Sequence, residues 1–457
     1  MAHLFHPTIL REYDIRGIVG DTLGVDDAVA LGLSFGSLII ENGGSRICVG
    51  YDGRQSSPEM ETALIDGLTS TGVNVDRVGR GPTPMLYYAT VESKADGGIM
   101  VTGSHNPPTH NGFKMMRGHK PFYGQAIQAL GYRASKGYFS SGNGVVKAAP
   151  AFDQYVNRVV QDFRGDKHLS AVWDPGNGAA GEAVVAAVNH LPGIHRIING
   201  DIDGTFPNHH PDPTDPENLL QLKLAVADSG ADVGFAFDGD GDRIGVIDGS
   251  GNILWGDQIM MILAEDVLAE RPGASIIADV KSSQALFDEI TRLNGKPVLA
   301  KTGHSLIKAK MAELESPLAG EMSGHIFFAD HYYGFDDALY AAIRLFSILC
   351  RIDCSLSERY SRLPIAFNTP EIRFECEDDR KFSVIEEVKA RLIAEGSKVN
   401  DIDGVRVSED GGWWLLRASN TQAILVARCE AESQQRLTEI KLKLATQLAQ
   451  SGLHLPA

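Results

Sequence analysis

Residues 231–243, ADVGFAFDGDGDR, join a short apolar run to a loop in which acidic residues alternate with glycines. Two other segments share this plan, an apolar run followed directly by a polar loop: residues 97–107, GGIMVTGSHNP, and residues 316–328, SPLAGEMSGHIFF. A short apolar run bounded by turn residues indicates a buried strand. We therefore expect three buried strands, each with a polar loop at its carboxyl end.

Each of these segments closes a longer unit that occurs three times along the chain. A unit begins with a buried strand, a polar turn and a helix, and continues with a second strand and a second helix. The three opening segments are RICVGYDGRQSSPEMETALIDGL (46–68), SAVWDPGNGAAGEAVVAAV (170–188) and SIIADVKSSQALFDEITRL (275–293). Alternating strands and helices predict right-handed crossovers and mixed, mostly parallel sheets, with binding loops at the carboxyl ends of the strands. The sequence thus predicts three similar α/β domains.

The remainder of the chain has a different pattern. From about residue 367 it predicts strands within residues 369–376, 404–419 and 423–431, a helix within 383–395 and a closing helix from Ser433. This order is typical of a smaller α+β domain. The predicted domains therefore span residues 1–150, 151–254, 255–366 and 367–457.

Composition excludes several classes of protein. The chain has 457 residues, 43% of them apolar and 22% charged, which favours large packed cores over disorder. Its net charge of -17 disfavours nucleic acids and acidic membranes as partners. The longest mostly apolar stretch, residues 30–40, is too short to span a bilayer, and the first residues lack the pattern of a secretory signal. We expect a cytoplasmic protein.

The five cysteines are few and scattered along the chain. Cys350 and Cys354 are spaced i, i+4 in an apolar run with helical periodicity. We therefore expect reduced thiols in the core rather than a disulfide framework.

The loop after the second of the apolar runs carries three carboxylates at a spacing of two residues, Asp238, Asp240 and Asp242. Such close like charges repel unless a cation neutralises them, and their hard oxygens favour magnesium or calcium. A calcium EF-hand does not fit, because Arg243 and Gly249 occupy its sixth and twelfth positions. A solvated acidic turn is the remaining alternative. Magnesium often shares its coordination with a phosphate, so the loop suggests a phosphorylated partner.

The loop of the first unit presents one hydroxyl nucleophile, Ser104. It does not match the G-x-S-x-G motif of hydrolases, because Thr102 and Asn106 stand at the glycine positions. Neighbouring side chains diverge in an extended segment, so His105 is not simply a triad base for Ser104. A phosphorylated serine would supply oxygens for the metal loop. A plain turn remains the alternative.

Two further loops carry polar groups suited to a phosphosugar. Glu321, Ser323 and His325 are residue types that hydrogen-bond sugar hydroxyls. The segment 417–421, RASNT, combines a guanidinium with hydroxyl and amide groups, which suits a phosphate. Taken alone, the loop with Glu321 is more typical of an ordinary polar turn, and the segment 417–421 fits a turn as well as it fits a phosphate site.

Residues 176–181, GNGAAG, fit the G-x-G-x-x-G fingerprint of dinucleotide-binding proteins, and Asp201 follows at the expected distance. An NAD-dependent oxidoreductase is therefore an alternative function. The equivalent turns of the other two units read DGRQSS and VKSSQA, so the position does not require glycines. The P-loop of ATPases is absent, because Gly295-Lys296 is followed by Pro297.

The motifs TGSHNP, DGDGDR, GEMSGH and RASNT, in this order, make the chain resemble the α-D-phosphohexomutases over nearly its full length, most closely the bacterial phosphomannomutase/phosphoglucomutase group. The resemblance implies four domains around a central cleft. It also implies an isomerase that interconverts hexose 1-phosphate and hexose 6-phosphate through a phosphoserine at Ser104 and a bisphosphosugar intermediate. A metal-dependent sugar phosphatase and a noncatalytic phosphosugar-binding protein remain alternatives.

The same resemblance implies a set of site residues. Magnesium would be held by Asp238, Asp240, Asp242 and phosphorylated Ser104. The catalytic groups would be Ser104, Lys114 (the general acid/base), Arg16, Arg243, His304, His325 and His105. The substrate would be bound by Tyr13, Lys281, Glu321, Ser323, Arg417, Ser419, Asn420 and Thr421, and Asn106 also matches a site position.

The implied cofactors are Mg²⁺ and a hexose 1,6-bisphosphate activator, with a phosphosugar as the partner and a monomer as the expected state. Met322 and Gly241 differ from the residues usual in glucosamine mutases and favour mannose and glucose. Those two sugars differ at one hydroxyl, and we expect both to be accepted. A hinge near Leu363-Pro364 would let the intermediate turn round.

Overall fold

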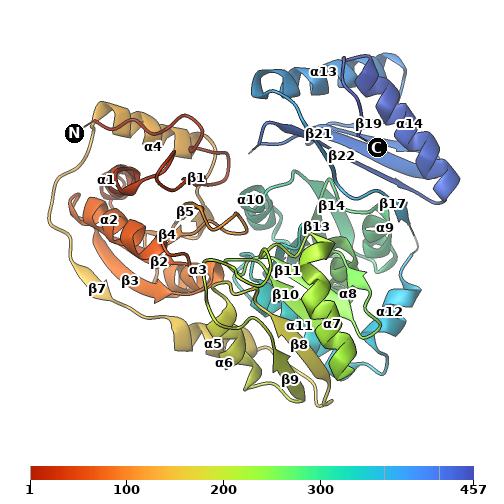
Figure 1. The fold of residues 1–457 in the computed structure, drawn as a ribbon, viewed down its shortest axis with the longest axis horizontal. Helices are drawn as coiled ribbons and strands as arrows, with labels where there is room; N and C mark the ends of the chain where they lie inside the picture. Colours follow the sequence, from red (N-terminus) through yellow and green to blue (C-terminus); the bar gives the residue numbers. More distant parts are fainter. Residues whose placement is uncertain (1, 365, 421, 457) are drawn as a thin grey trace.

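The computed structural model of the protein describes residues 2–364, 366–420 and 422–456. Figure 1 shows four bodies in chain order, with the first domain beside the second and third and the C-terminal domain above the third. Each contains one β-sheet, and each sheet lies within one of the predicted domain ranges. The boundaries near residues 150, 254 and 366 stay predictions. No helix in the described ranges has the length and apolar character that crossing a membrane requires.

The first domain is a seven-stranded mixed sheet with helices packed on it. Its elements are β1 (Ile15–Ile18), α1 (Val25–Glu41), β2 (Arg46–Tyr51), α2 (Ser57–Thr69), β3 (Asn74–Arg80), α3 (Thr83–Glu92), β4 (Gly97–Val101), β5 (His110–Arg117), β6 (Lys120–Pro121), α4 (Gln125–Lys136) and β7 (Val146–Ala148). The order is β1-β5-β4-β2-β3-β7, parallel from β4 to β7 and antiparallel at β5 and β1. The loop after β4 and the turn after β2 therefore lie at the same edge of the sheet.

The second domain repeats the plan with five strands. Its elements are α5 (Phe152–Val160), β8 (Ser170–Asp174), α6 (Gly181–Val188), β9 (Ile194–Ile197), the 3₁₀ helix η1 (Pro216–Leu219), α7 (Leu220–Ser229), β10 (Val233–Phe237), β11 (Ile244–Asp248) and β12 (Ile253–Leu254). The order is β12-β11-β10-β8-β9, with β10, β8 and β9 parallel. All five residues of β10 are buried, as its uninterrupted apolar run predicts.

The third domain has four strands and supplies a helix to its neighbour. Its elements are α8 (Gly256–Glu270), β13 (Ser275–Asp279), α9 (Gln284–Arg292), β14 (Lys296–Ala300), α10 (His304–Leu314), β15 (Leu318–Gly320), β16 (Ile326–Phe328), α11 (Ala338–Arg351) and α12 (Leu356–Arg362). The order is β14-β13-β15-β16, with β16 antiparallel. Helix α11 is almost wholly buried and packs against α5, β10 and β11 of the second domain as well as α8 and β16.

The C-terminal domain is an antiparallel sheet with two helices, as predicted. Its elements are β17 (Phe367–Asn368), β18 (Ile372–Glu375), α13 (Asp378–Ala394), β19 (Val399–Asn400), β20 (Val405–Glu409), β21 (Gly412–Ala418), β22 (Ile424–Ala431) and α14 (Gln434–Ala449). The side chain of Ser433 accepts the N–H of Arg436 and caps α14. The domain has its own core around Trp414, and its Trp413 and Leu415 pack on Val280 of the third domain, whereas the largest core contains residues of the first three domains. Within the part of the chain that the structure describes, the C-terminal domain thus contributes no buried residue to the core that the other three domains share.

One prediction about the cysteines is wrong. Helix α11 ends at Arg351 because Ile352 adopts an extended conformation (φ -98°, ψ 155°). Cys354 therefore lies outside the helix and is only half-buried, whereas Cys48, Cys350, Cys376 and Cys429 are buried free thiols.

Candidate active site

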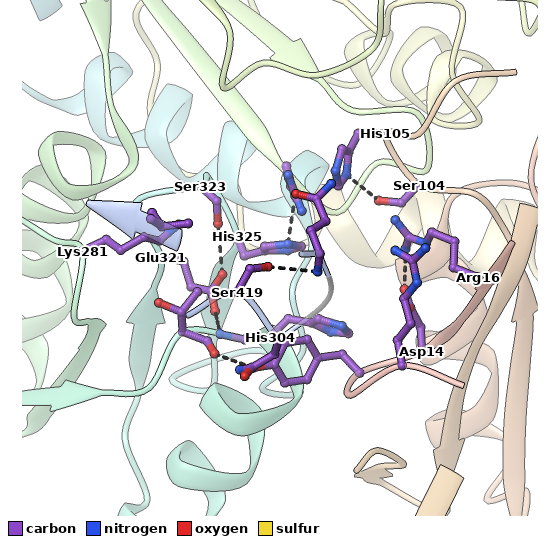
Figure 2. A pocket seen from close by; sticks show the side chains of 18 of the residues that line it. Asp14, Arg16, Ser104, His105, Lys281, His304, Glu321, Ser323, His325 and Ser419 are labelled. Atoms are coloured by element: carbon purple, nitrogen blue, oxygen red, sulfur yellow. Dashed lines mark hydrogen bonds and ion pairs between the residues drawn. The ribbon is translucent and has the colours of Figure 1, made fainter. Parts of the chain in front are cut away.

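All four domains line one cavity, which is open to solvent and measures about 1070 Å³ with that open space included. Figure 2 shows Arg16, Ser104 and His105 on one side of it and Lys281, Glu321 and Ser323 on the other. The predicted site residues that line the cavity are Tyr13, Arg16, Ser104, His105, Asn106, Lys114, Arg243, Lys281, His304, Glu321, Ser323, His325, Arg417, Ser419 and Asn420. The structure thus brings the predicted loops of all four domains to one place. Thr421 lies outside the described residues.

Ser104 occupies the turn directly after β4 and is only 2% exposed. Its φ of 51° lies in the left-handed region, which non-glycine residues rarely adopt and which is common at functional sites. The hydroxyl donates to Oδ2 of Asp238 at 3.1 Å, and it lies 3.2 Å from Nδ1 of His105. Its backbone N–H donates to Oγ1 of Thr102 at 2.8 Å. The serine loop and the metal loop of the neighbouring domain therefore meet at the hydroxyl.

Asp238, Asp240 and Asp242 are fully buried next to this hydroxyl. One oxygen of each lies within 4.8 Å of the others, which is close enough to share one metal ion. Oδ1 of Asp238 accepts the backbone N–H groups of Asp242 (3.0 Å) and Arg243 (3.1 Å), so the loop curls around it. Burial and the charges of the other two carboxylates raise the pKa of Asp238 well above its usual range.

Lys114, on β5, reaches into this acidic cluster. Its ammonium donates to Oδ2 of Asp240 at 2.7 Å and to Oδ2 of Asp242. Burial alone would lower the pKa of Lys114, but the three carboxylates outweigh it and raise the pKa above its ordinary value. Oδ1 of Asp240 and Oδ1 of Asp242 are buried and have no hydrogen-bond partner among the described residues. The lysine thus neutralises part of the cluster and leaves two oxygens free to bind another cation.

Close backbone contact holds the two loops together. A Cβ on Gly239 would lie 2.3 Å from the carbonyl oxygen of Ser104, so only glycine permits this approach. On the other side, the backbone N–H of Thr83 donates to the carbonyl of Asp240 at 2.8 Å. The distance between the hydroxyl and the carboxylates therefore depends on a glycine between two of the acids.

The loop between β15 and β16 carries Glu321 and Ser323. Oε1 of Glu321 accepts the N–H of Gly303 at 2.6 Å, and Oε2 accepts the hydroxyl of Ser323 at 3.0 Å. These bonds fix the carboxylate at the cavity wall. Two adjacent acceptors at fixed positions suit a pair of neighbouring sugar hydroxyls.

The far end of the cavity is built by the C-terminal domain. Arg417, at the end of β21, pairs with Asp403 through Nε at 3.0 Å, and Asp403 also accepts the N–H of Thr302. Asn420 donates to the hydroxyl of Tyr13 at 2.7 Å, which links this domain to the first. These contacts hold a guanidinium and an amide at the wall of the same cavity that Ser104 lines.

Family models for four domains match the chain in order. They describe the phosphoglucomutase/phosphomannomutase α/β/α domain I (residues 7–133), domain II (153–251), domain III (255–367) and C-terminal domain (371–447). The chain belongs to the phosphoglucomutase/phosphomannomutase family. The predicted family, fold class and enzyme class are thereby confirmed.

Individual relatives agree with the family models. A phosphomannomutase/phosphoglucomutase of Pseudomonas aeruginosa is 42% identical over 449 residues, 98% of this chain and 97% of that one. A phosphoglucomutase of Neisseria gonorrhoeae is 42% identical over 437 residues, 95% of each chain. The X-ray structure of a phosphoglucomutase/phosphomannomutase family protein from Burkholderia thailandensis has a TM-score of 0.93 at 42% identity, covering 98% of this chain and 99% of that one.

Sequence reasoning missed one acid behind the histidines of this mutase-family site. Asp336 is fully buried, and its Oδ2 lies 3.0 Å from Nδ1 of His325 and 3.7 Å from Nδ1 of His304. Its Oδ1 accepts from Nζ of Lys308 at 2.9 Å. On the opposite edge of the His325 ring, Nε2 accepts the Nε–H of Arg243 at 3.0 Å. Asp336 belongs to no motif in the sequence. Only its place in the folded structure, in the segment after β16, marks it as a residue of the site.

One further acid, Glu371, holds two cations on the C-terminal side of the cavity. Glu371 accepts from Nζ of Lys281 at 2.6 Å and from Nη2 of Arg373 at 2.8 Å. Burial opposes ionisation of Glu371, but the charges of Lys281 and Arg373 outweigh it and lower its pKa. Both Glu371 and Arg373 line the cavity and were not predicted.

The glycine-rich turn that matched a dinucleotide fingerprint has a structural explanation in this family member. The N–H of Ala179 donates to the carbonyl of Gly239 at 2.9 Å. A Cβ on Gly178 would lie 2.9 Å from that same oxygen. The glycines therefore let the turn after β8 pack against the metal loop.

Proposed function

We propose that this enzyme interconverts hexose 1-phosphates and hexose 6-phosphates of mannose and glucose, through a phosphoserine at position 104 and a bisphosphosugar that turns round in the cavity. The observation that carries the proposal is the hydrogen bond between the Ser104 hydroxyl and Asp238, in a cavity that Arg417 of the C-terminal domain also lines. A nucleophile at one end and a phosphate-binding group at the other suit a sugar with a phosphate at either end.

The acidic cluster fits Mg²⁺. Its oxygen donors are hard, three carboxylates converge, and two of their oxygens lack a hydrogen-bond partner among the described residues. Asp238, Asp240 and Asp242 would hold the ion together with the phosphate on Ser104. When bound, the ion would offset negative charge on the transferring group.

In the transfer, a free sugar hydroxyl oxygen bonds to the phosphorus of phosphoserine while the bond from phosphorus to Oγ of Ser104 breaks. The hydroxyl proton must leave, and Oγ must be neutralised. Lys114, beside the metal loop, has the predicted acid/base role; its ion pairs with Asp240 and Asp242 oppose loss of its proton, so it acts as the acid only once those pairs are weakened. His325 lines this end of the cavity and would take the hydroxyl proton at Nε2 once Arg243, whose Nε–H donates to that nitrogen at 3.0 Å, turns to the phosphate. The remaining predicted groups of the phosphoryl-transfer site would stabilise the charge on the transferring phosphoryl group or line the cavity around it: Arg16, Arg243, His105 and His304.

The other phosphate would be bound by Arg417, Ser419, Asn420 and Thr421, with Lys281 and Tyr13 beside them. Glu321 and Ser323 would hold hydroxyls that superpose in both orientations of the sugar. After the first transfer the bisphosphosugar must exchange its ends, because each phosphate faces Ser104 once per cycle. Glucose 1,6-bisphosphate or its mannose counterpart would therefore activate the enzyme by phosphorylating Ser104. We propose that Leu363-Pro364 supply the hinge for this exchange.

Acceptance of both sugars rests on the relatives, which are named both as phosphomannomutase/phosphoglucomutase and as phosphoglucomutase. Glucose and mannose differ in the orientation of one hydroxyl. An enzyme that binds the phosphate and the hydroxyls common to both sugars would tolerate that difference.

The test incubates the enzyme separately with mannose 1-phosphate and glucose 1-phosphate, with magnesium and a trace of bisphosphosugar, and follows 6-phosphate against inorganic phosphate. The mutase predicts 6-phosphate without net release of phosphate, and Ser104→Ala removes the product. Ser135→Ala, at a half-buried serine of α4 outside the cavity lining, is the matched control and should keep full activity. Stoichiometric release of inorganic phosphate would instead identify a sugar phosphatase.

A further inference from the structure

A buried arginine lies directly beneath the serine loop. Arg54, in the turn after β2, has a side chain that is only 1% exposed and does not line the cavity. Its Nη2 donates to the carbonyls of Ser104 (2.8 Å) and Asn106 (2.5 Å). Its Nη1 donates to the carbonyls of Pro107 (2.6 Å) and His110 (2.9 Å). One guanidinium therefore binds four backbone oxygens of the loop.

The same arginine is fixed from its own side by Asp52. Nε of Arg54 donates to Oδ2 of Asp52 at 3.2 Å, and this oxygen also accepts the N–H of Gly103 at 3.1 Å. The hydroxyl of Ser57 donates to Oδ1 of Asp52 at 2.6 Å. A Cβ on Gly103 would lie 2.4 Å from Cζ of Arg54, so this glycine lets the guanidinium lie flat against the loop. Asp52 and Arg54 together bind both the donors and the acceptors of the turn that carries the nucleophile.

Arg54 also contacts the domain that supplies the metal loop. Its guanidinium lies 5.2 Å from the centre of the Phe206 ring. A Cβ on Gly204 would lie 2.4 Å from Cα of Arg54, so the two backbones touch. The arginine is thus packed between the serine loop of the first domain and residues 204–206 of the second.

The backbone conformation of Ser104 explains why the serine loop needs the contacts made by Arg54 and Asp52, which together we call the clamp. A left-handed φ in a non-glycine residue costs of the order of 1 kcal/mol and persists only where the surroundings enforce it. The carbonyl of Ser104 is both a partner of Arg54 and the atom that touches Gly239 of the metal loop. A lysine could neutralise Asp52, but it could not bind four carbonyls in a planar, fixed arrangement.

We infer that Arg54 is a positioning residue for phosphoryl transfer, which holds the hydroxyl of Ser104 against the metal loop by fixing the backbone of the serine loop. It touches neither the sugar nor the transferred phosphate. The inference rests on the proposed function for its reaction, and on the four carbonyl contacts for its geometry.

The test compares Arg54→Lys and Arg54→Gln with Arg344→Lys. Arg344 is a buried arginine of α11 that pairs with Asp330 and lies outside the cavity lining, which makes it the matched control. Two readouts are taken: amide hydrogen exchange of residues 102–110 in the resting protein, and kcat and KM for hexose 1-phosphate. A misplacement of about 1 Å at a reacting group can cost on the order of 100-fold in rate.

Both Arg54 variants should exchange the amides of residues 102–110 at least about tenfold faster, with β2 and β4 unchanged. Their kcat should fall about 100-fold, while KM stays within about threefold because the sugar is held by the third and fourth domains. Wild-type exchange and kcat in Arg54→Lys would overturn the inference, as would an equal loss of kcat in Arg344→Lys. The exchange measurement needs no substrate, so it tests the clamp even if the unaltered enzyme proves not to be a mutase.

Discussion

The serine loop and the metal loop occupy the same position in two copies of one structural unit, yet they are held in different ways. The serine loop carries a neutral hydroxyl and is bound by the side chains of Asp52 and Arg54. The metal loop carries three buried carboxylates; the glycine turn at Gly178 contacts its backbone, and the side chains of Lys114 and Thr83 bind Asp240. In both domains the support comes from the turn after the unit's first strand. The repeated unit therefore determines where each loop lies in the domain, and the turn after the unit's first strand fixes the backbone of that loop.

The largest effect should come from a charge of the metal loop. Asp240→Asn keeps the shape of the side chain but removes one of the converging carboxylates, so kcat should fall on the order of 1,000-fold, as when one group that stabilises transferring charge is lost. Asp228→Asn, on the exposed end of α7, is the control. A kcat within about tenfold of wild type would show that the charges of this loop do not serve the reaction.

A smaller effect is expected from removing the ammonium group of Lys114, which lies within the acidic cluster. Lys114→Met leaves Asp240 and Asp242 buried without their partner, which should lower the free energy of unfolding by about 3 kcal/mol. Because a divalent cation can replace the missing charge, millimolar magnesium should raise the melting temperature of this variant more than that of wild type. Lys310→Met, which breaks an exposed pair with Glu313, is the control. Equal responses to magnesium in all three proteins would contradict cation binding at this cluster.

The contact between the two loops can be tested by one methyl group. Gly239→Ala places a Cβ 2.3 Å from the carbonyl of Ser104 and should push the loops apart. We expect kcat to fall about 30-fold with a normal circular dichroism spectrum, because positioning and not folding is disturbed. Gly24→Ala, whose Cβ would meet its nearest atom at 3.9 Å, should behave as wild type. Full activity of Gly239→Ala would mean that the loops need not touch.

The smallest effect is a pH dependence of the free energy of unfolding, which we expect from a carboxyl group next to the metal loop. Asp337 caps α11, whose residue Ala338 donates its N–H to the carbonyl of Gly241 at 3.3 Å. Burial raises the pKa of Asp337 to about 6, against hydrogen bonds that lower it. The neutral form stabilises the fold, so this stability is complete below pH 4 and is lost as pH rises through 6.

Denaturant unfolding of wild type and Asp337→Asn measures this contribution. Relative to the variant, wild type should lose about 1 kcal/mol between pH 5 and pH 7. Ser57→Ala, which weakens the support of the serine loop, should shift stability equally at both pH values. A pH-independent difference between wild type and Asp337→Asn would reject the assignment.

The repeated units and their loops were predictable because strand, helix and turn preferences act over a few neighbouring residues. The loops after β4, β10 and β15, and the segment after β21, carry the polar residues that the motifs indicated. The same local reasoning failed at Cys354, because helix α11 ends at Arg351 and leaves this cysteine outside the helix.

By itself, the sequence determined three α/β units, a smaller last domain, the order of the four polar loops and the family. Only the tertiary structure decided which groups lie behind those loops: Arg54 under Ser104, Asp336 behind His325, Glu371 beside Lys281 and Asp403 beside Arg417. Those acids and that arginine belong to ordinary-looking turns, and most of their partners are distant in the chain. Burial in a folded interior is what makes such contacts strong and specific, and burial arises only when separate units pack together.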